Sequence, residues 1–250
     1  MLVYLATYPR CGNSFLRGMI VENWDYWVST VYPVPREAIA AKWSAIGYAP
    51  LADGLAAYSR GTPRRMIQPG CALDRERLAA DPAIFFIKTH ELPFERYFPG
   101  EVVIQMVRHP VAAIWSYKRL LDRTKDRDYD ILDVSAGKVQ FGPWSAYHDA
   151  WEGLAVRVRY EDALTDESAA VRTIADAVGL PLGKVRFTDF AAAHAKNPVR
   201  FRQGTADGWQ SLPQRTIDRI MADHRVTAER LGYHVNRSGW WSRLSIRRFL

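Results

Sequence analysis

The sequence predicts an α/β protein with a central parallel β-sheet flanked by helices. Short apolar runs rich in β-branched residues recur along the chain, a polar or charged cluster follows each run, and a helical pattern follows each cluster. Buried parallel strands joined by crossover helices have this pattern. The four runs are Leu2–Ala6, Ile84–Ile87, Val102–Val107 and Ala155–Val158.

Helices are expected after these runs and near the end of the chain. The expected helices are Ser14–Asn23, Pro110–Asp122, Glu167–Val178 and Pro213–Leu231. Pro110 suits a first helical turn, and Gly232 suits the position after a helix C-terminus. The segments Tyr32–Pro69 and Thr124–Pro143 have weak periodicity, so loops and short helices are expected there, the first over one end of the sheet.

Length and composition indicate one folded domain over residues 1–236, followed by a basic aromatic C-terminal tail over 237–250. A hydrophobic content of 48% with 24% charged residues excludes disordered and fibrous classes. The two cysteines, Cys11 and Cys71, offer no disulfide framework, which fits a reducing compartment. The net charge of +7 favours an anionic ligand over a basic one.

The predicted location is the cytoplasm. Leu2 already begins the first predicted strand, no signal-like segment precedes it, and no apolar run is long enough to span a bilayer. The tail Gly239–Leu250 mixes aromatic residues with arginines and contains no acids, so it has two interpretations. Packing on the folded body is favoured over weak peripheral contact with the inner face of the membrane. A nucleic-acid partner is not expected, because no recognised reading motif is present.

The segment Thr7–Arg17, TYPRCGNSFLR, links the first strand to the first helix. Such a loop directs free backbone N–H groups and the positive end of the helix dipole at one point, where an anion can bind. Against the triphosphate-binding pattern GxxxxGK[ST], Gly12 and Ser14 match, but Asn13 replaces the lysine and the positive charge stands at Arg10. The loop therefore predicts a phosphate ligand without the lysine of an ATP site.

Basic residues follow the other strands. Lys88, Arg108 and Arg159 come at strand ends, which meet at one edge of a parallel sheet, so a ligand with more than one anionic group is expected. His90 stands two residues after Lys88, and a neutral imidazole there is suited to taking a proton from a hydroxyl. A purely structural role for His90 is equally compatible with the sequence. The other histidines lack metal-ligand spacing, so no metal site is expected.

A basic, glycine-punctuated segment, Phe201–Trp209, precedes the last predicted helix. Its glycines permit close approach of the backbone to a ligand, and Arg202 could cover an anion. An ordinary surface turn is the alternative interpretation.

Five motifs, in order, now point to a family. The ordered set YPRCGNSFLR, KTH, RHPVAAIWSYKR, RYEDAL and FRQGTADGW resembles the sulfotransferases that use 3′-phosphoadenosine 5′-phosphosulfate (PAPS). The set extends from about residue 4 to residue 209. The resemblance implies a P-loop NTPase-like sulfotransferase fold of the bacterial type and a cytoplasmic transferase.

The resemblance assigns the first loop to the 5′-phosphosulfate of PAPS, with backbone amides and the Ser14 hydroxyl on the phosphate. Arg10 takes the place of the family's lysine, which keeps the charge but changes its reach and geometry. The implied cofactor-binding residues of this loop are Arg10, Cys11, Gly12, Asn13, Ser14 and Phe15.

Further residues match the family's 3′-phosphate and adenine positions. Arg108 and Ser116 match the 3′-phosphate pair, and Tyr160 matches an aromatic position near the adenine. Thr188 and Phe190, in a T-x-F pattern, match further positions near the adenine. The late loop that closes on the same phosphate corresponds to Arg202, Gln203 and Gly204, with Gln203 where a second basic residue is common.

Lys88 and His90 match the family's K-x-H, in which the histidine is the general base and the lysine assists transfer. The implied reaction is transfer of a sulfuryl group from PAPS to an acceptor hydroxyl of a carbohydrate, glycolipid or small natural product, with adenosine 3′,5′-bisphosphate as the product and no metal. Catalysis is assigned to His90, Lys88 and Arg10. The alternatives are an ATP-dependent small-molecule or nucleotide kinase and an inactive sulfotransferase-like binding module. The oligomeric state is left open.

Overall fold

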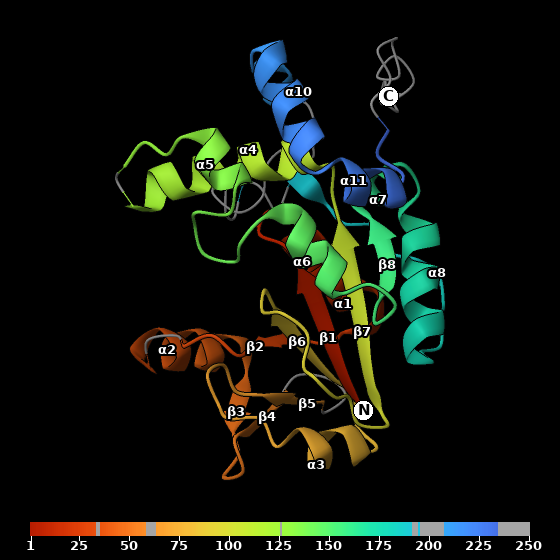
Figure 1. The fold of residues 1–250 in the computed structure, drawn as a ribbon. Coiled ribbons are helices and arrows are strands. Elements are labelled where there is room, and N and C mark those ends of the chain that lie inside the picture. The colour runs from red at the N-terminus through yellow and green to blue at the C-terminus, as the bar shows by residue number, and fades with distance from the viewer. Residues whose placement is uncertain (34–35, 59–63, 126, 192–194, 196–207, 235–250) are drawn as a thin grey trace.

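The computed structural model describes residues 1–33, 36–58, 64–125, 127–191, 195 and 208–234 (Figure 1). Its centre is a five-stranded sheet in the order β2-β6-β1-β7-β8, in which every neighbouring pair is parallel. The predicted α/β class and parallel sheet are confirmed. The strands are β1 (Leu2–Thr7), β2 (Val28–Thr30), β6 (Phe85–Thr89), β7 (Glu101–Val107) and β8 (Val156–Arg159).

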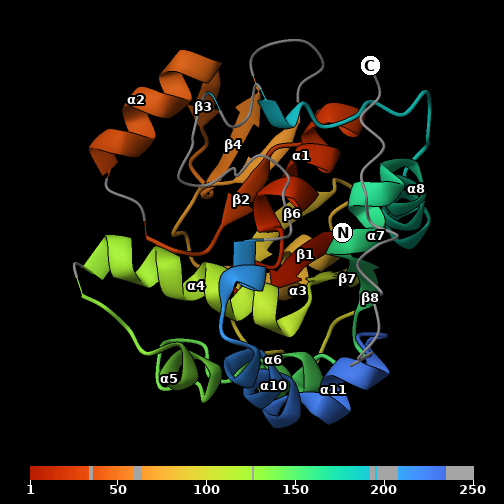
Figure 2. The ribbon, with the colours of Figure 1, turned by 90° about the horizontal axis from the view of Figure 1, so that it is seen from above.

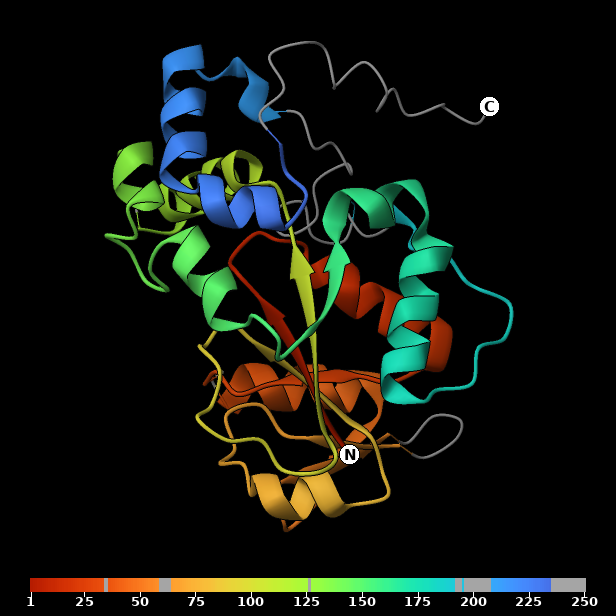
Figure 3. The ribbon, with the colours of Figure 1, turned by 45° about the vertical axis from the view of Figure 1, so that its right-hand side comes forward.

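Helices cover both faces of this sheet (Figure 3). Val3 and Leu5 of β1 pack into one core with α1 (Asn13–Trp24) and α8 (Glu167–Val178). Leu2, Tyr4 and Ala6 point to the opposite face, because successive side chains alternate along a strand. Both sides of β1 are therefore buried, which explains its continuous apolar sequence. The helices on the second face include α4 (Pro110–Lys125), α6 (Trp144–Ala150), α10 (Gln214–Asp223) and α11 (Arg225–Arg230).

The predicted helices form, with one division. The predicted helix Glu167–Val178 has the observed bounds of α8, and Pro110 begins α4. The predicted single helix Pro213–Leu231 is divided at His224 into α10 and α11, which Figure 2 shows beside α6. Hydrogen bonds of 3.0 Å to Ser135 and 2.9 Å to Ser145 tie the His224 imidazole to two other helical segments. The division depends on these contacts with residues far away in the sequence, so periodicity alone did not show it.

The expectation for Tyr32–Pro69 was wrong in part. This segment contains the helix α2 (Arg36–Ile46) and a three-stranded antiparallel sheet rather than loops and short helices alone. The strands are too short for a clear alternation, and they have a small core of their own around Trp43, Tyr48 and Met66. The strands are β3 (Tyr48–Pro50), β4 (Leu55–Tyr58) and β5 (Arg65–Ile67).

The remaining short helices are α3 (Arg75–Ala80), α5 (Ile131–Ser135), α7 (Tyr160–Thr165) and the 3₁₀ helix η1 (Gly208–Ser211). The short helix α5 within a long connection confirms the expectation for Thr124–Pro143. None of the helices in the described part of the chain is long and apolar enough to cross a membrane.

Candidate active site

The candidate site lies at the carboxyl edge of the parallel sheet. Ala6 in β1 is opposite Thr89 in β6, and Thr7 is opposite Met106 in β7. The residues that follow these strands are therefore neighbours, as the sequence predicted. In an open parallel sheet this edge is where ligands bind.

The loop between β1 and α1 is tight at Gly12. Gly12 has a φ of 100°, and an added Cβ would lie 2.5 Å from Met106 Sδ and 2.6 Å from the Tyr160 ring. Only glycine fits both the conformation and the space. Gly12 precedes the helix α1 and has no side chain to cap it, so the first-turn N–H groups are available to an anion.

The side chains assigned to the two ends of PAPS meet in the structure. Arg10 Nε donates to Ser116 Oγ at 3.1 Å, and an Nη atom of Arg108 donates to the Arg10 carbonyl at 3.1 Å. The Arg108 guanidinium also lies 4.6 Å from the centre of the Tyr160 ring. Arg108 is only 9% exposed, and its Nε has no hydrogen-bond partner among the described residues. A buried cationic donor of this kind suits an anionic ligand.

Aromatic residues gather beside this arginine. The Phe15 ring is 6.0 Å from the Tyr160 ring and 4.8 Å from the Phe190 ring. Thr188 lies close to Gly18 of α1, but its hydroxyl donates to Glu167 at 2.7 Å. The structure thus brings Phe15, Tyr160 and Phe190 together, where a flat ring of a ligand could stack.

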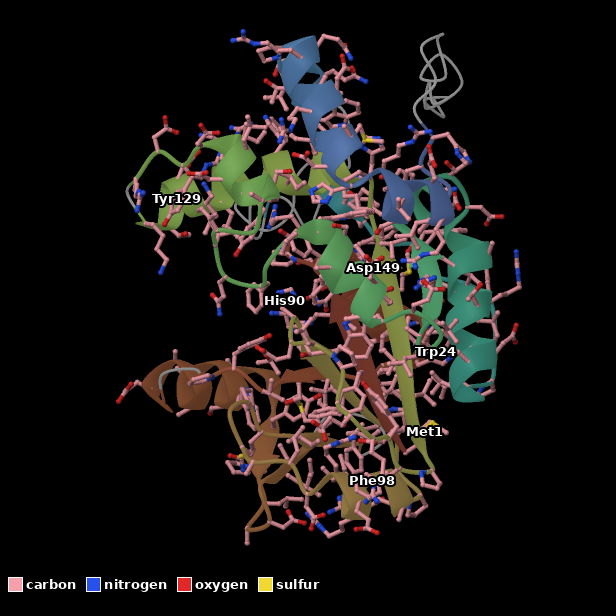
Figure 4. All side chains as sticks on the ribbon, in the orientation of Figure 1. Met1, Trp24, His90, Phe98, Tyr129 and Asp149 are labelled. Atoms are coloured by element: carbon pink, nitrogen blue, oxygen red, sulfur yellow. The ribbon has the colours of Figure 1, made fainter. Side chains whose placement is uncertain are left out.

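His90 is fixed by the end of β1. Its Nδ1 lies 2.6 Å from the Thr7 carbonyl oxygen, which can only accept, so Nδ1 carries the proton and Nε2 keeps a lone pair. Burial, and then the nearby Lys88 charge, lower the pKa of His90 to about 4. His90 is therefore neutral at physiological pH, with the tautomer that a general base requires. Figure 4 shows His90 at the edge of the parallel sheet where β6 ends.

Phe141 is a site neighbour that sequence reasoning missed. Its ring meets the His90 ring edge-on at 5.4 Å, and its backbone has a φ of 78°, which is rare for a bulky residue. Hydrogen bonds from Tyr8 to the Gly142 carbonyl and from Tyr117 to the Gln140 carbonyl hold the loop around it. The Phe-Gly-Pro turn is visible in the sequence, but nothing there indicates contact with His90.

Arg159, which the sequence placed at the same edge of the sheet, contacts Tyr233 and Asp162. Its guanidinium lies 4.6 Å from the centre of the Tyr233 ring and 3.7 Å from Asp162. The Tyr233 hydroxyl donates to Glu161, whose other oxygen accepts from the His109 N–H at 3.0 Å. This network holds the turn that follows β7.

Some of the residues singled out in the sequence are buried, and others lie outside the residues that the structure describes. Cys11 is fully buried, and burial raises the pKa of its thiol to about 12, so the thiol stays neutral. Trp24, Trp43, Trp144 and Trp151 are buried in the cores. No group of three metal-ligating side chains occurs in the part of the chain that the structure describes. Outside that part lie Arg202, Gln203, Gly204 and the tail 237–250.

Comparison with known proteins agrees with this arrangement. Residues 88–184, which include Lys88, His90, Arg108, Ser116 and Tyr160, match the model of a sulfotransferase family. No curated protein sequence matches the chain.

Solved structures to which the chain is similar include two sulfotransferases and a retinol dehydratase. Mouse sulfotransferase SULT7A1 complexed with PAP is 17% identical, with a TM-score of 0.60, and the match covers 93% of this chain and 88% of the other. The sulfotransferase domain of the Synechococcus PCC 7002 olefin synthase is 16% identical, with a TM-score of 0.54 and coverage of 94% and 95%. Retinol dehydratase in complex with androsterone and inactive cofactor PAP is 16% identical, with a TM-score of 0.53 and coverage of 91% and 80%. The chain has the sulfotransferase fold.

Proposed function

We propose that this chain transfers a sulfuryl group from PAPS to an acceptor hydroxyl of a carbohydrate, glycolipid or small natural product. The proposal rests mainly on one observation: the carboxyl ends of β1, β6 and β7 lie side by side, and each is followed by a residue group suited to PAPS. The glycine loop follows β1, Lys88 and His90 lie at the end of β6, and Arg108 follows β7. Two of the structures with a similar fold contain PAP, which supports the cofactor.

The residues present fit PAPS at three points. The first-turn amides of α1 and Ser14 would hold the 5′-phosphosulfate. Arg108 and Ser116 would hold the 3′-phosphate, for which the unpaired Arg108 Nε among the described residues is the structural support. Tyr160 and Phe190 would stack on the adenine. When bound, PAPS supplies the sulfuryl group together with a phosphate leaving group.

The chain's own residues would supply the proton chemistry and the charge. His90 Nε2 would take the proton from the acceptor hydroxyl, since Nδ1 is held by Thr7. Arg10 and Lys88 would stabilise the negative charge that develops during transfer, and arginine keeps this charge at all pH values. Phe141 beside His90 would exclude water and contact an apolar part of the acceptor.

The proposal predicts PAPS-dependent sulfation. The full chain is incubated with PAPS and a panel of phenols, sugars, glycolipids and aliphatic alcohols, and sulfated product and adenosine 3′,5′-bisphosphate are quantified by mass spectrometry. We expect equal amounts of the two products with at least one acceptor class and no requirement for added magnesium. Phosphoryl transfer from ATP with no sulfuryl transfer would contradict the proposal in favour of a kinase. Binding of the bisphosphate without turnover across the panel would indicate a binding module.

A further inference from the structure

We infer that Tyr32 is a positioning residue that holds Lys88 and His90 in place, an inference that rests on the proposed function of this pair. Tyr32 touches both residues at once. Its hydroxyl lies 2.7 Å from the His90 backbone N–H, and its ring centre lies 4.5 Å from the Lys88 ammonium. No sequence motif points to Tyr32, because it belongs to the connection after β2.

The sheet register brings Tyr32 to this place. Thr30, the last residue of β2, is opposite Lys88 in β6, so the residue two positions later lies beside His90. The Tyr32 N–H donates to Thr30 Oγ1 at 3.3 Å, and the Gly70 N–H donates to the Thr30 carbonyl at 3.1 Å. The turn that carries Tyr32 is therefore fixed from both sides.

The hydroxyl of Tyr32 completes the hold on His90. It accepts from the His90 N–H, and the Glu91 carboxylate lies near it. Burial raises the pKa of Tyr32, so the hydroxyl stays protonated and its oxygen accepts from the His90 N–H. With Nδ1 on Thr7, both the backbone and the ring of His90 are fixed. The direction of Nε2 is thereby set, and proton transfer depends strongly on such alignment.

The ring of Tyr32 gives the Lys88 ammonium a contact that leaves its charge intact. A carboxylate at this position would neutralise the ammonium, whereas an aromatic face attracts a cation without cancelling its charge. The Tyr32 and His90 rings are also close, with centres 6.0 Å apart and planes inclined by 33°. One side chain therefore positions the proposed base, His90, and the Lys88 cation relative to each other.

Two variants separate the hydroxyl from the ring. Tyr32→Phe keeps the ring and removes the acceptor for the His90 N–H, so kcat should fall by roughly 10-fold with the KM for PAPS changed less than about 2-fold. Tyr32→Leu also removes the cation contact, so kcat should fall further, by roughly 100-fold. Tyr58→Phe is the matched control, because Tyr58 is half-buried against Trp27 and Tyr48 in another sheet. It should keep kcat unchanged.

A spectroscopic measurement tests the positioning role without any turnover. In the full chain, NMR follows hydrogen exchange of the His90 amide and the titration of its imidazole. Tyr32→Phe should raise the His90 amide exchange rate by at least about 10-fold and shift the imidazole titration, with the amides in the middle of β6 and the melting temperature little changed. A kcat within about 2-fold of the parent together with unchanged His90 signals would overturn the inference. If the parent transfers no sulfuryl group, the proposed function fails, and the NMR result alone decides for or against the positioning role.

Discussion

Replacing His90 by glutamine is expected to lower kcat for sulfuryl transfer by about 10²–10⁴-fold, the range for loss of a general base. Glutamine is neutral and of similar size, but it has no basic lone pair to replace His90 Nε2. The affinity for adenosine 3′,5′-bisphosphate should stay unchanged, because the cofactor contacts come from the α1 loop and Arg108. Product formation by mass spectrometry and ligand binding by calorimetry measure the two quantities separately. His234→Gln, at an exposed histidine, is the matched control.

The pH profile of the parent chain provides a second test of His90. Its pKa in the ligand-free protein is about 4, so the neutral base is fully present at pH 7 and is lost only as the pH falls through that value. The acid limb of kcat/KM should therefore lie near pH 4. Bound anionic cofactor favours the protonated imidazole, so the limb of kcat should lie at higher pH. A His90→Gln variant with near-full activity, or the same acid limb in that variant as in the parent, would contradict the assigned role.

Replacing Arg108 by methionine is expected to raise the Kd for adenosine 3′,5′-bisphosphate by roughly 30- to 1,000-fold, corresponding to about 2–4 kcal/mol for a lost charged contact. Methionine keeps an apolar stem against the Tyr160 ring but has no donors for the phosphate or for the Arg10 carbonyl. Calorimetric titration gives the Kd, and the 3′-phosphate-free adenosine 5′-monophosphate shows whether the loss depends on that phosphate.

The control for this variant is Arg172→Met, which removes an exposed arginine on α8. It changes the net charge by the same amount, so it corrects for long-range electrostatic attraction. Equal affinities of the Arg108 and Arg172 variants for the bisphosphate would contradict the assignment of Arg108 to the 3′-phosphate.

The parallel sheet could be predicted because each of its main strands is a short apolar run that can be recognised in the sequence by itself. β1 is buried on both faces and reads as an unbroken apolar run, and the residues that follow β1, β6 and β7 could then be placed at one edge. The positions of Arg10, His90 and Arg108 followed from that edge. Their contacts with one another depend on side-chain direction, which a sequence pattern does not give.

The elements that were missed depend on tertiary packing. The strands of the antiparallel sheet have three or four residues each, too few for a period to be recognised. Tyr32 reaches His90 only because β2 pairs with β6, and Phe141 does so only because its loop is held by Tyr8 and Tyr117. The contact of Arg159 with Tyr233, far along the chain, likewise depends on tertiary packing.

Thermal unfolding of the full chain with adenosine 3′,5′-bisphosphate tests the central claim, that this edge of the sheet is a PAPS site. At a ligand concentration 100 times the Kd, binding should stabilise the native state by about 2.7 kcal/mol, a rise in Tm of roughly 5–10 °C for a chain of this length. We expect this rise without added metal, a much smaller one with adenosine 5′-monophosphate, and its loss in Arg108→Met. An unchanged Tm with the bisphosphate, or a rise only with ATP and magnesium, would contradict the claim.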